Sequence, residues 1–476
     1  MVDIDTSNSQ TNPFDSVMRA AYAVYVTRLK SFKYQSYSDL NDSVVLETAF
    51  KVEVQDSMDM YFRTAKVWFI DRYALREIMP LTGNEIITIK YKNMAQPAAT
   101  VEKTIHFQIQ SITEVPNLRE YNKGSNITLL NLVEAPAFSF LTNNCVYKTY
   151  PWDTKMKVSD LVNDCLLSIP GLLNWYDIDI EETSNAEGAK FSFYNPNWTP
   201  MKTINYLKKF AISQKDDFPY YTFFIEPPKT KSGKPKIHFK PVYKYMAEKG
   251  RHTISSHFQQ EVYRSAQGDT NKLARDYSKE NDYEIFNTMQ SRQFDYFHRA
   301  KTAFAQMSGE TFYTFDYIND NKYYALDYST FKNTYQGLGQ KQLHSMNYGN
   351  QWASHRPHSF TDNLRLLNMK RNEMAYNTIH SGIACTAEMT INNFRNVGHL
   401  ADVIFKTSLD QQSGVDYMMS GLWLIWGQTD EMQDGAARSK VIMIKDGFEQ
   451  LMINPDLPAM THLNPPIGVS KAKSQS

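Results

Sequence analysis

Apolar and polar residues alternate through much of the first third of the chain. In the segment 50–93, Val52 and Val54 are flanked by polar residues, which is the two-residue period of a half-buried strand. Turn residues and further alternating runs follow, so we expect a mostly antiparallel β domain at residues 20–145. The strands predicted there lie at 21–33, 50–55, 65–71, 85–91, 101–109 and 127–133.

The periodicity changes to that of helices in the next part of the chain. Apolar residues of the segment 158–169 follow the i, i+3, i+4, i+7 spacing, and Pro170 ends the run. A second helix is expected to begin at Pro200, because proline suits the first helical position and Thr199 before it is a good N-cap. Together with two strands, these helices predict an α+β domain at 146–245. The strands are expected at 220–225 and 236–240.

The remaining residues predict a second β region and a final sheet. Strands are expected at 311–317 and 322–328, and a helix at 362–380 precedes the alternating run 383–391. The fold class is therefore α+β and mostly β. The predicted organisation is a flexible arm (1–19), a β domain (20–145), an α+β domain (146–245), a second β domain (246–360), a helix with a barrel-like sheet that packs with 146–245 (361–450), and an extended C-terminal tail (451–476).

Charge and composition narrow the possible functions. Lys plus Arg equals Asp plus Glu at 51 each, which argues against a dedicated nucleic-acid binder, although it allows brief contact with DNA. Low net charge favours self-association. We expect no membrane segment, since no apolar run reaches about 18 residues, and no secretory signal at the polar N-terminus. Three scattered cysteines out of 476 residues suit reduced thiols and folding in a cytoplasm.

Motifs for cofactor or metal binding are weak. The run 337–339 begins like a dinucleotide fingerprint but lacks its third glycine. His355 and His358 are three residues apart, yet Pro357 disfavours the helix that would place both on one metal. We therefore expect no cofactor and no metal ligand.

Catalytic carboxylates are also weakly indicated. Glu181 and Glu182 are adjacent, as are Asp216 and Asp217, but adjacent side chains point apart, whereas glycosidases need two carboxylates that face one cleft. No catalytic residue is assigned, and the chain is not expected to be an enzyme.

The order of elements resembles the central baseplate hub protein of contractile-tailed bacteriophages of the T-even type. The segments that carry the resemblance are 52–57 with 80–87, 197–207 with the strand 220–225, and 362–380 with the strand 383–391, Asn393-Phe394-Arg395 and the closing strands through Ile444. The resemblance implies a homotrimeric structural ring in the virion tail, assembled in the host cytoplasm.

The same resemblance implies how the domains and partners would be arranged. Residues 20–145 and 246–360 would be two tail-tube-like domains, so that three chains give a pseudo-sixfold ring, and 146–245 with 361–445 would close the torus. The ring would join the tail tube, or a tube-initiator protein, to the central spike protein. Baseplate wedge proteins would surround it, and DNA would pass through its channel during ejection.

Two turns are expected to contact neighbouring subunits or the tube. The candidate interface residues are Asp56, Ser57 and Met58 in one turn and Gly83, Asn84 and Glu85 in the other.

Other functions remain open at the sequence level. The hub of a related contractile injection machine, such as a secretion-system or bacteriocin spike complex, would have a similar architecture. A tail-associated cell-wall hydrolase would need catalytic carboxylates, and a host-receptor adhesin would usually show fibrous repeats, which this sequence lacks.

Overall fold

The structure is a computed structural model of the chain. It describes residues 20–28, 43–46, 48–71, 81, 85–93, 102–115, 126–135, 155–186, 189–190, 197–216, 218–228, 233–246, 252–255, 283–294, 310–316, 322–328, 356–357, 368–369, 372–373, 375–376, 379–380, 383–389, 391–404, 421–433 and 436–445.

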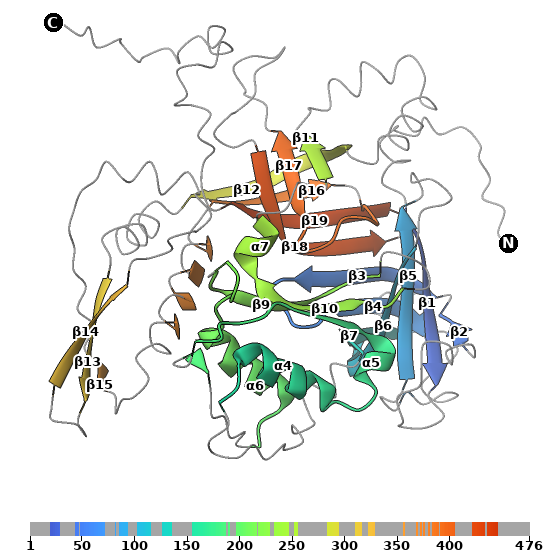
Figure 1. Cartoon of the computed structure of the whole chain (residues 1–476). Coiled ribbons are helices and arrows are strands. Elements are labelled where there is room, and N and C mark those ends of the chain that lie inside the picture. The colour runs from blue at the N-terminus through green and yellow to red at the C-terminus, as the bar shows by residue number, and fades with distance from the viewer. Residues whose placement is uncertain are drawn as a thin grey trace, which may run out of the picture.

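One large curled sheet of 13 strands organises these residues (Figure 1). Its strand order is β17-β11-β12-β16-β19-β18-β3-β4-β7-β6-β5-β1-β2. The first half of the chain supplies β1 (Ala20–Arg28), β2 (Ser43–Val45), β3 (Ala49–Ser57), β4 (Thr64–Asp71), β5 (Glu85–Asn93), β6 (Lys103–Val115) and β7 (Asn126–Glu134). The second half supplies β11 (His252–Ser255), β12 (Tyr283–Phe294), β16 (Ile383–Met389), β17 (Leu400–Ile404), β18 (Gly421–Gln433) and β19 (Ala436–Lys445).

The long strand β18 joins the two halves of this sheet because it changes partner along its length. Its first residues pair with β17, from Gly421 to Leu424. After a β-bulge at Trp426, its residues from Gly427 to Gln433 pair with β3 instead. Its other edge pairs with β19 from Leu424 to Gln433, apart from the bulge. A bulge bends a strand and increases its twist. The first part of β18 therefore belongs to one curved part of the large sheet, and the second part belongs to another.

The pairing of β17 with β18 closes six strands into a barrel, which we call the C-terminal barrel: β11, β12, β16, β17, β18 and β19. Its interior is apolar and is filled by Cys385, Ala387, Met389, Ala401, Val403, Trp423, Ile425, Val441 and Met443. The predicted barrel-like sheet is therefore present. Two of its strands come from the segment expected to form a second tube-like domain, so strand pairing crosses residue 360. The domain boundaries themselves stay a prediction.

The seven strands β1 to β7 form the N-terminal sheet, which has one apolar face. Alternate side chains such as Val52, Val54, Val67 and Ile89 are buried together on this face. The residues between them point to the opposite face. The alternation seen in the sequence is the pattern that a sheet with a single buried face requires.

Four α-helices, a 3-10 turn and a small sheet form an α/β unit beneath the N-terminal sheet, in the lower half of Figure 1. Its elements are α4 (Val158–Leu167), α5 (Leu172–Trp175), β8 (Asp177–Ile180), α6 (Pro200–Leu207), the 3-10 turn Lys208–Phe210, β9 (Tyr221–Glu226), β10 (Lys236–Pro241) and α7 (Val242–Met246). The order of its sheet is β8-β10-β9. The hydroxyl of Thr199 accepts a hydrogen bond from the amide of Lys202, which confirms the predicted N-cap of α6.

Two smaller parts complete the described structure. The residues described between 368 and 380 are helical, and Asn372 anchors this helix by bonds to the backbone of Ala211 and Tyr220. The strands β13 (Glu310–Asp316), β14 (Lys322–Tyr328) and β15 (Arg356–Pro357) form a separate sheet, which stands apart at the left of Figure 1.

The predicted fold class, mostly β with helix-containing parts, is confirmed. One local prediction is wrong: Asp56 and Ser57 were expected in a turn, but they continue β3. They do so because β18, which is distant in sequence, pairs with β3 as far as Ser57, opposite Gly427. The turn follows at Met58 and Asp59.

The C-terminal barrel and the α/β unit meet at Gly398. This residue has φ +83, and a Cβ built on it would lie 2.6 Å from the ring carbon Cζ of Phe224 in β9. The Phe224 ring is buried and has no space to move away. Glycine is therefore required both by the backbone conformation and by the close contact.

Substitution of this glycine should destabilise the protein strongly. We expect Gly398→Ala to cost about 2–4 kcal/mol, from the left-handed backbone and the overlap with Phe224. Gly427→Ala is the matched control, since its added Cβ would meet nothing nearer than 3.6 Å and should change stability by less than about 1 kcal/mol. The thermal unfolding midpoints of the two variants show whether Gly398→Ala is the less stable one. Equal midpoints would contradict the close contact.

Candidate functional site

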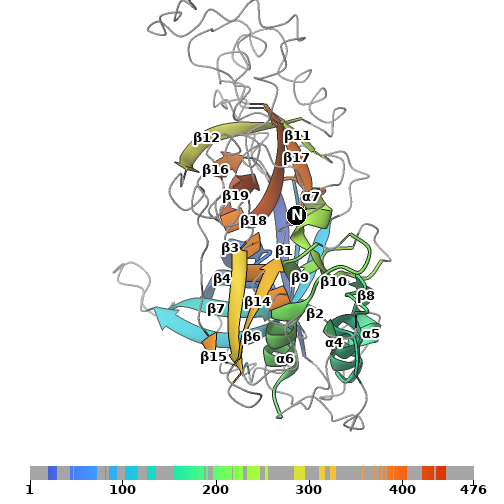
Figure 2. The ribbon, with the colours of Figure 1, turned by 60° about the vertical axis from the view of Figure 1, so that its left-hand side comes forward.

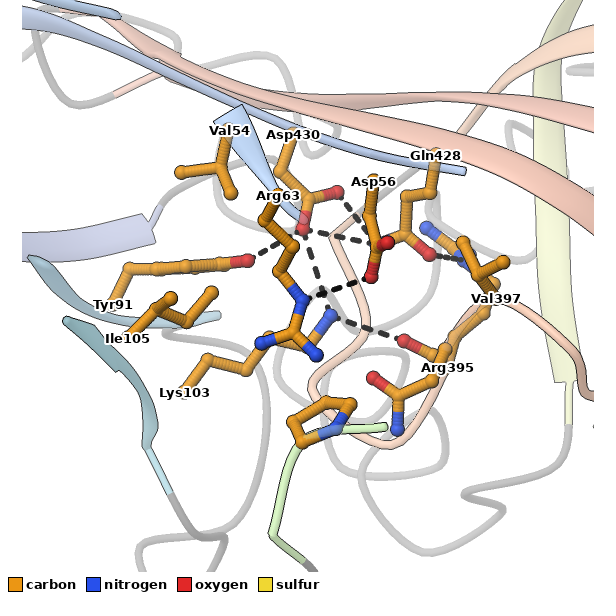
Figure 3. Close-up of a pocket in the computed structure, with 12 residues that line it drawn as sticks. Val54, Asp56, Arg63, Tyr91, Lys103, Ile105, Arg395, Val397, Gln428 and Asp430 are labelled. Carbon is orange, nitrogen blue, oxygen red and sulfur yellow. Dashed lines mark hydrogen bonds and ion pairs between the residues drawn. The ribbon is translucent and has the colours of Figure 1, made fainter. Parts of the chain in front are cut away.

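A buried network of charged and polar side chains lies where the N-terminal sheet meets β18 and the segment 391–397 (Figure 3). It surrounds a cavity of about 20 Å³. We call it the ion network and define it as Asp56, Arg63, Tyr91, Lys103, Glu134, Arg395, Gln428, Asp430 and Ser439.

Arg63 connects three parts of the fold. It follows the turn after β3, and its side chain is 3% exposed. Its Nε donates to Asp56 at 3.0 Å, its Nη1 donates to Glu134 at 3.3 Å, and its Nη2 donates to the carbonyl of Ile225 at 2.5 Å. Tyr176 of the α/β unit donates to Glu134 at 3.4 Å. One guanidinium thus joins β3, β7 and β9.

Asp430 is the second centre of the ion network. It lies on the inward face of β18 and accepts hydrogen bonds from Tyr91 at 2.8 Å, Gln428 at 2.7 Å and Ser439 at 2.7 Å. The ammonium of Lys103 lies 3.6 Å from it, as the dashed lines of Figure 3 show. This carboxylate therefore holds β18 and β19 against β5 and β6.

The segment 391–397 is attached to the same network. Lys103 donates to the backbone carbonyl of Arg395 at 3.0 Å, and the Arg395 side chain donates to Gln428 at 3.4 Å. Asn93 at the end of β5 donates to the carbonyl of Ile391 at 2.6 Å. The bonds of Lys103 and Asn93 tie the C-terminal half to the N-terminal sheet, and the bond of Arg395 joins the segment to β18.

Burial and pairing shift the ionisation of Arg63 and Glu134 in opposing ways. Burial disfavours the charged guanidinium, but Glu134 and Asp56 more than offset it and raise the pKa of Arg63 above its ordinary value. Burial raises the pKa of Glu134 to about 7, although Arg63 works against this. Since the folded state holds this proton more tightly, Glu134 favours folding at low pH, and its contribution is lost as the pH rises through about 7.

The groups around Asp430 behave differently. Burial opposes its charge, but Lys103 and Arg395 prevail, so the pKa of Asp430 lies below its usual range. Burial lowers the pKa of Lys103, and it lowers that of Arg395 to about 10, with Asp430 opposing both shifts. Each of these shifts therefore combines the cost of burial with the attraction between Asp430 and its two cationic neighbours.

This arrangement serves to hold the fold together rather than to bind a substrate. The carboxylates are already occupied by donors of the same chain, and the cavity has room for about one water molecule. Among the residues that the structure describes, no cluster of His, Cys, Asp and Glu could hold a metal ion. Within the same part of the chain, no helix is long and apolar enough to cross a membrane.

The structure separates the two predicted interface turns. Asp56 belongs to the ion network, Ser57 accepts a bond from the amide of Asp59 at 3.2 Å, and Met58 is buried. Glu85 is fully buried at the far end of β5, six residues from Tyr91 and hence about 20 Å along the strand. Gly83 and Asn84 lie outside the described residues, and the interface assignment stays a prediction.

The acidic pairs weighed in the sequence do not form a carboxylate pair in a cleft among the described residues. Glu181 and Asp216 both approach the ammonium of Lys244, at 2.5 and 3.7 Å. Glu182 lies 3.6 Å from Lys157. The residues Asp217, His355, His358, Cys145 and the run 337–339 lie outside the described part of the chain. Cys165 and Cys385 are buried, and the thiol of Cys165 donates to the carbonyl of Pro200 at 3.7 Å.

Sequence reasoning missed the ion network, although a local signal exists. On β3 the inward positions read Val52, Val54, Asp56, and on β18 they read Met432, Asp430. A charged residue that continues the apolar side of an alternating strand indicates a buried partner. Which partner it meets depends on strand pairing that the sequence does not reveal.

Comparisons with known proteins give structural likeness only. No protein-family model and no curated protein matches the chain. Similar solved structures include a tail protein from Neisseria meningitidis MC58 and the 43 kDa tail protein of prophage MuSo2 from Shewanella oneidensis. Each is 10% identical with a TM-score of 0.49, and the match covers 90% of this chain and 98% or 100% of theirs.

A third similar structure is the lidded PdpA–VgrG complex of Francisella. The matched chain is 10% identical with a TM-score of 0.46, and the match covers 90% of this chain and 53% of that one. At these values the likeness concerns the backbone arrangement alone.

Removing Arg63 should be far more costly than removing an exposed arginine. Arg63→Met leaves the buried carboxyl of Glu134 and the half-buried one of Asp56 without their cation, so we expect a loss of about 3–5 kcal/mol. The matched control is Arg438→Met, which breaks the pair with Glu431 at an exposed position and should cost less than about 1 kcal/mol. Urea unfolding of both variants provides the measurement. A small effect of Arg63→Met would show that the network is not needed for stability.

Proposed function

We propose that this chain is a structural subunit of a phage tail, namely the homotrimeric central hub of the baseplate. In this role it joins the sixfold tail tube to the threefold spike and leaves a channel for DNA. The proposal combines the resemblance of the sequence with one observation, the polar face of the large sheet. That face runs without interruption from the C-terminal barrel into the N-terminal sheet.

The polar face is built from cross-strand neighbours that point away from the buried core. Figure 2 shows β16, β19, β18, β3, β4 and β7 stacked in this order. One row across the strands reads Glu388, Lys440, Thr429, Gln55, Thr64, and the next reads Arg438, Glu431, Glu53, Lys66, Asn131, Ser111. The inward residues between them fill the cores.

Several charges on the polar face pair with one another. Glu431 lies 2.5 Å from Lys51 and 2.7 Å from Arg438, and Arg438 also lies 3.9 Å from Glu388. A channel wall of this kind is hydrated and carries cations and carboxylates in nearly equal number. Because phosphate binding depends on an excess of cations, DNA would pass along this face without being retained.

The free end of the sheet supports ring formation. β2 is the last strand in the order of the sheet, and it pairs only with Tyr25 to Thr27 of β1. Open edges pair readily with another chain, and cyclic closure removes them. We therefore place subunit contacts at this end of the sheet, in addition to the two turns predicted from the sequence.

The partners follow from this geometry together with the resemblance. The tail tube or a tube initiator would stack on one face of the ring, the central spike protein would bind the other, and wedge proteins would surround it. The role is structural rather than enzymatic, which is supported by the carboxylates of the ion network, because donors of the same chain already occupy them. A hub of a secretion-system or bacteriocin spike complex would use the same ring without DNA.

Electron microscopy of the purified full chain tests the ring directly. We expect threefold particles with a central hole, either alone or after addition of the tube protein from the same genome. Particles that remain monomeric under both conditions would refute the hub assignment.

Labelling of single cysteines tests which face lines the channel. In a Cys145→Ser background, Gln55→Cys lies on the polar face, and Lys209→Cys lies on the exposed side of the α/β unit. Within rings, a small maleimide should label both, whereas a polymer-linked maleimide should label Gln55→Cys several-fold more slowly than Lys209→Cys. Isolated subunits serve as the control. Equal polymer labelling within rings would exclude this face as the wall.

A further inference from the structure

One side of α6 and of the 3-10 turn that follows it carries aromatic rings and ammonium groups side by side. Trp198, Lys202, Tyr206 and Phe210 recur at four-residue spacing, and residues three or four apart are neighbours on a helix surface. Lys209 follows Tyr206 by three residues and lies on the same side. We call these five residues the aromatic–lysine ridge. In Figures 1 and 2 its helix lies at the end of the molecule opposite the C-terminal barrel.

The start of the helix determines where the Trp198 ring lies. Asn197 before it has φ +62, a left-handed conformation that asparagine adopts more readily than most residues. The chain turns at this point, and Trp198 packs on the side of α6. Its ring meets that of Tyr206 edge to face, with centroids 5.4 Å apart. The ammonium of Lys202 lies 4.8 Å from the centroid of the same ring, so two neighbours hold it in place.

The three rings of the ridge belong only partly to the core. All are half-buried. Tyr206 also meets Phe210 edge to face at 5.2 Å, and both pack against the edge of the core of the α/β unit, so that part of their area serves the fold. The printed contacts of Trp198 are instead with Tyr206 and Lys202. A large ring that its neighbours hold partly in water is typical of protein interfaces.

Discussion

The pairing of β18 with β3 is the contact on which the rest of the structure depends. It brings residues near 430 against residues near 55, so the loop that it closes includes almost the whole chain. Closing such a loop costs entropy before any contact compensates for it. The compensation comes from the two curved sheets that this pairing makes continuous, and from the cores that fill each of them.

The ion network fixes the register of that pairing. A shift of β18 by one residue would turn its inward side chains outward. Asp430 would then leave Tyr91 and Lys103, and the buried cations would lose their counter-charge. A purely apolar contact would tolerate such a shift more easily, because neighbouring aliphatic residues can substitute for one another. Buried ion pairs often add little net stability, and here their geometry specifies one alignment.

Sequence patterns predicted the strands and helices whose formation depends on residues close to one another in sequence. Alternation located β3, β5, β7 and β16, and the Thr199-Pro200 pair located the start of α6. The strand β12 was missed because its sequence, Tyr283–Phe294, is mostly polar and forms a strand by completing a barrel. Asp56 was predicted at a turn and an interface, whereas pairing with β18 keeps it in a strand beside Arg63. The partners of Arg63 and Asp430 are distant in sequence, and no local pattern could identify them.

The pairing of β18 with β3 also decides which charged side chains lie on the buried side of the sheet and which lie on the outer side. Inward charges face opposite charges, because an unmatched buried charge would cost several kcal/mol. Some outward charges are also paired, namely Glu431 with Lys51 and Arg438, although exposure to water does not require it. A face on which opposite charges pair attracts a passing polyanion only weakly, which gives the pairing a physical reason. The register of β18 contributes to this pairing, because it aligns Glu431 with Arg438. The register of β18 is in this way linked to the channel that we propose.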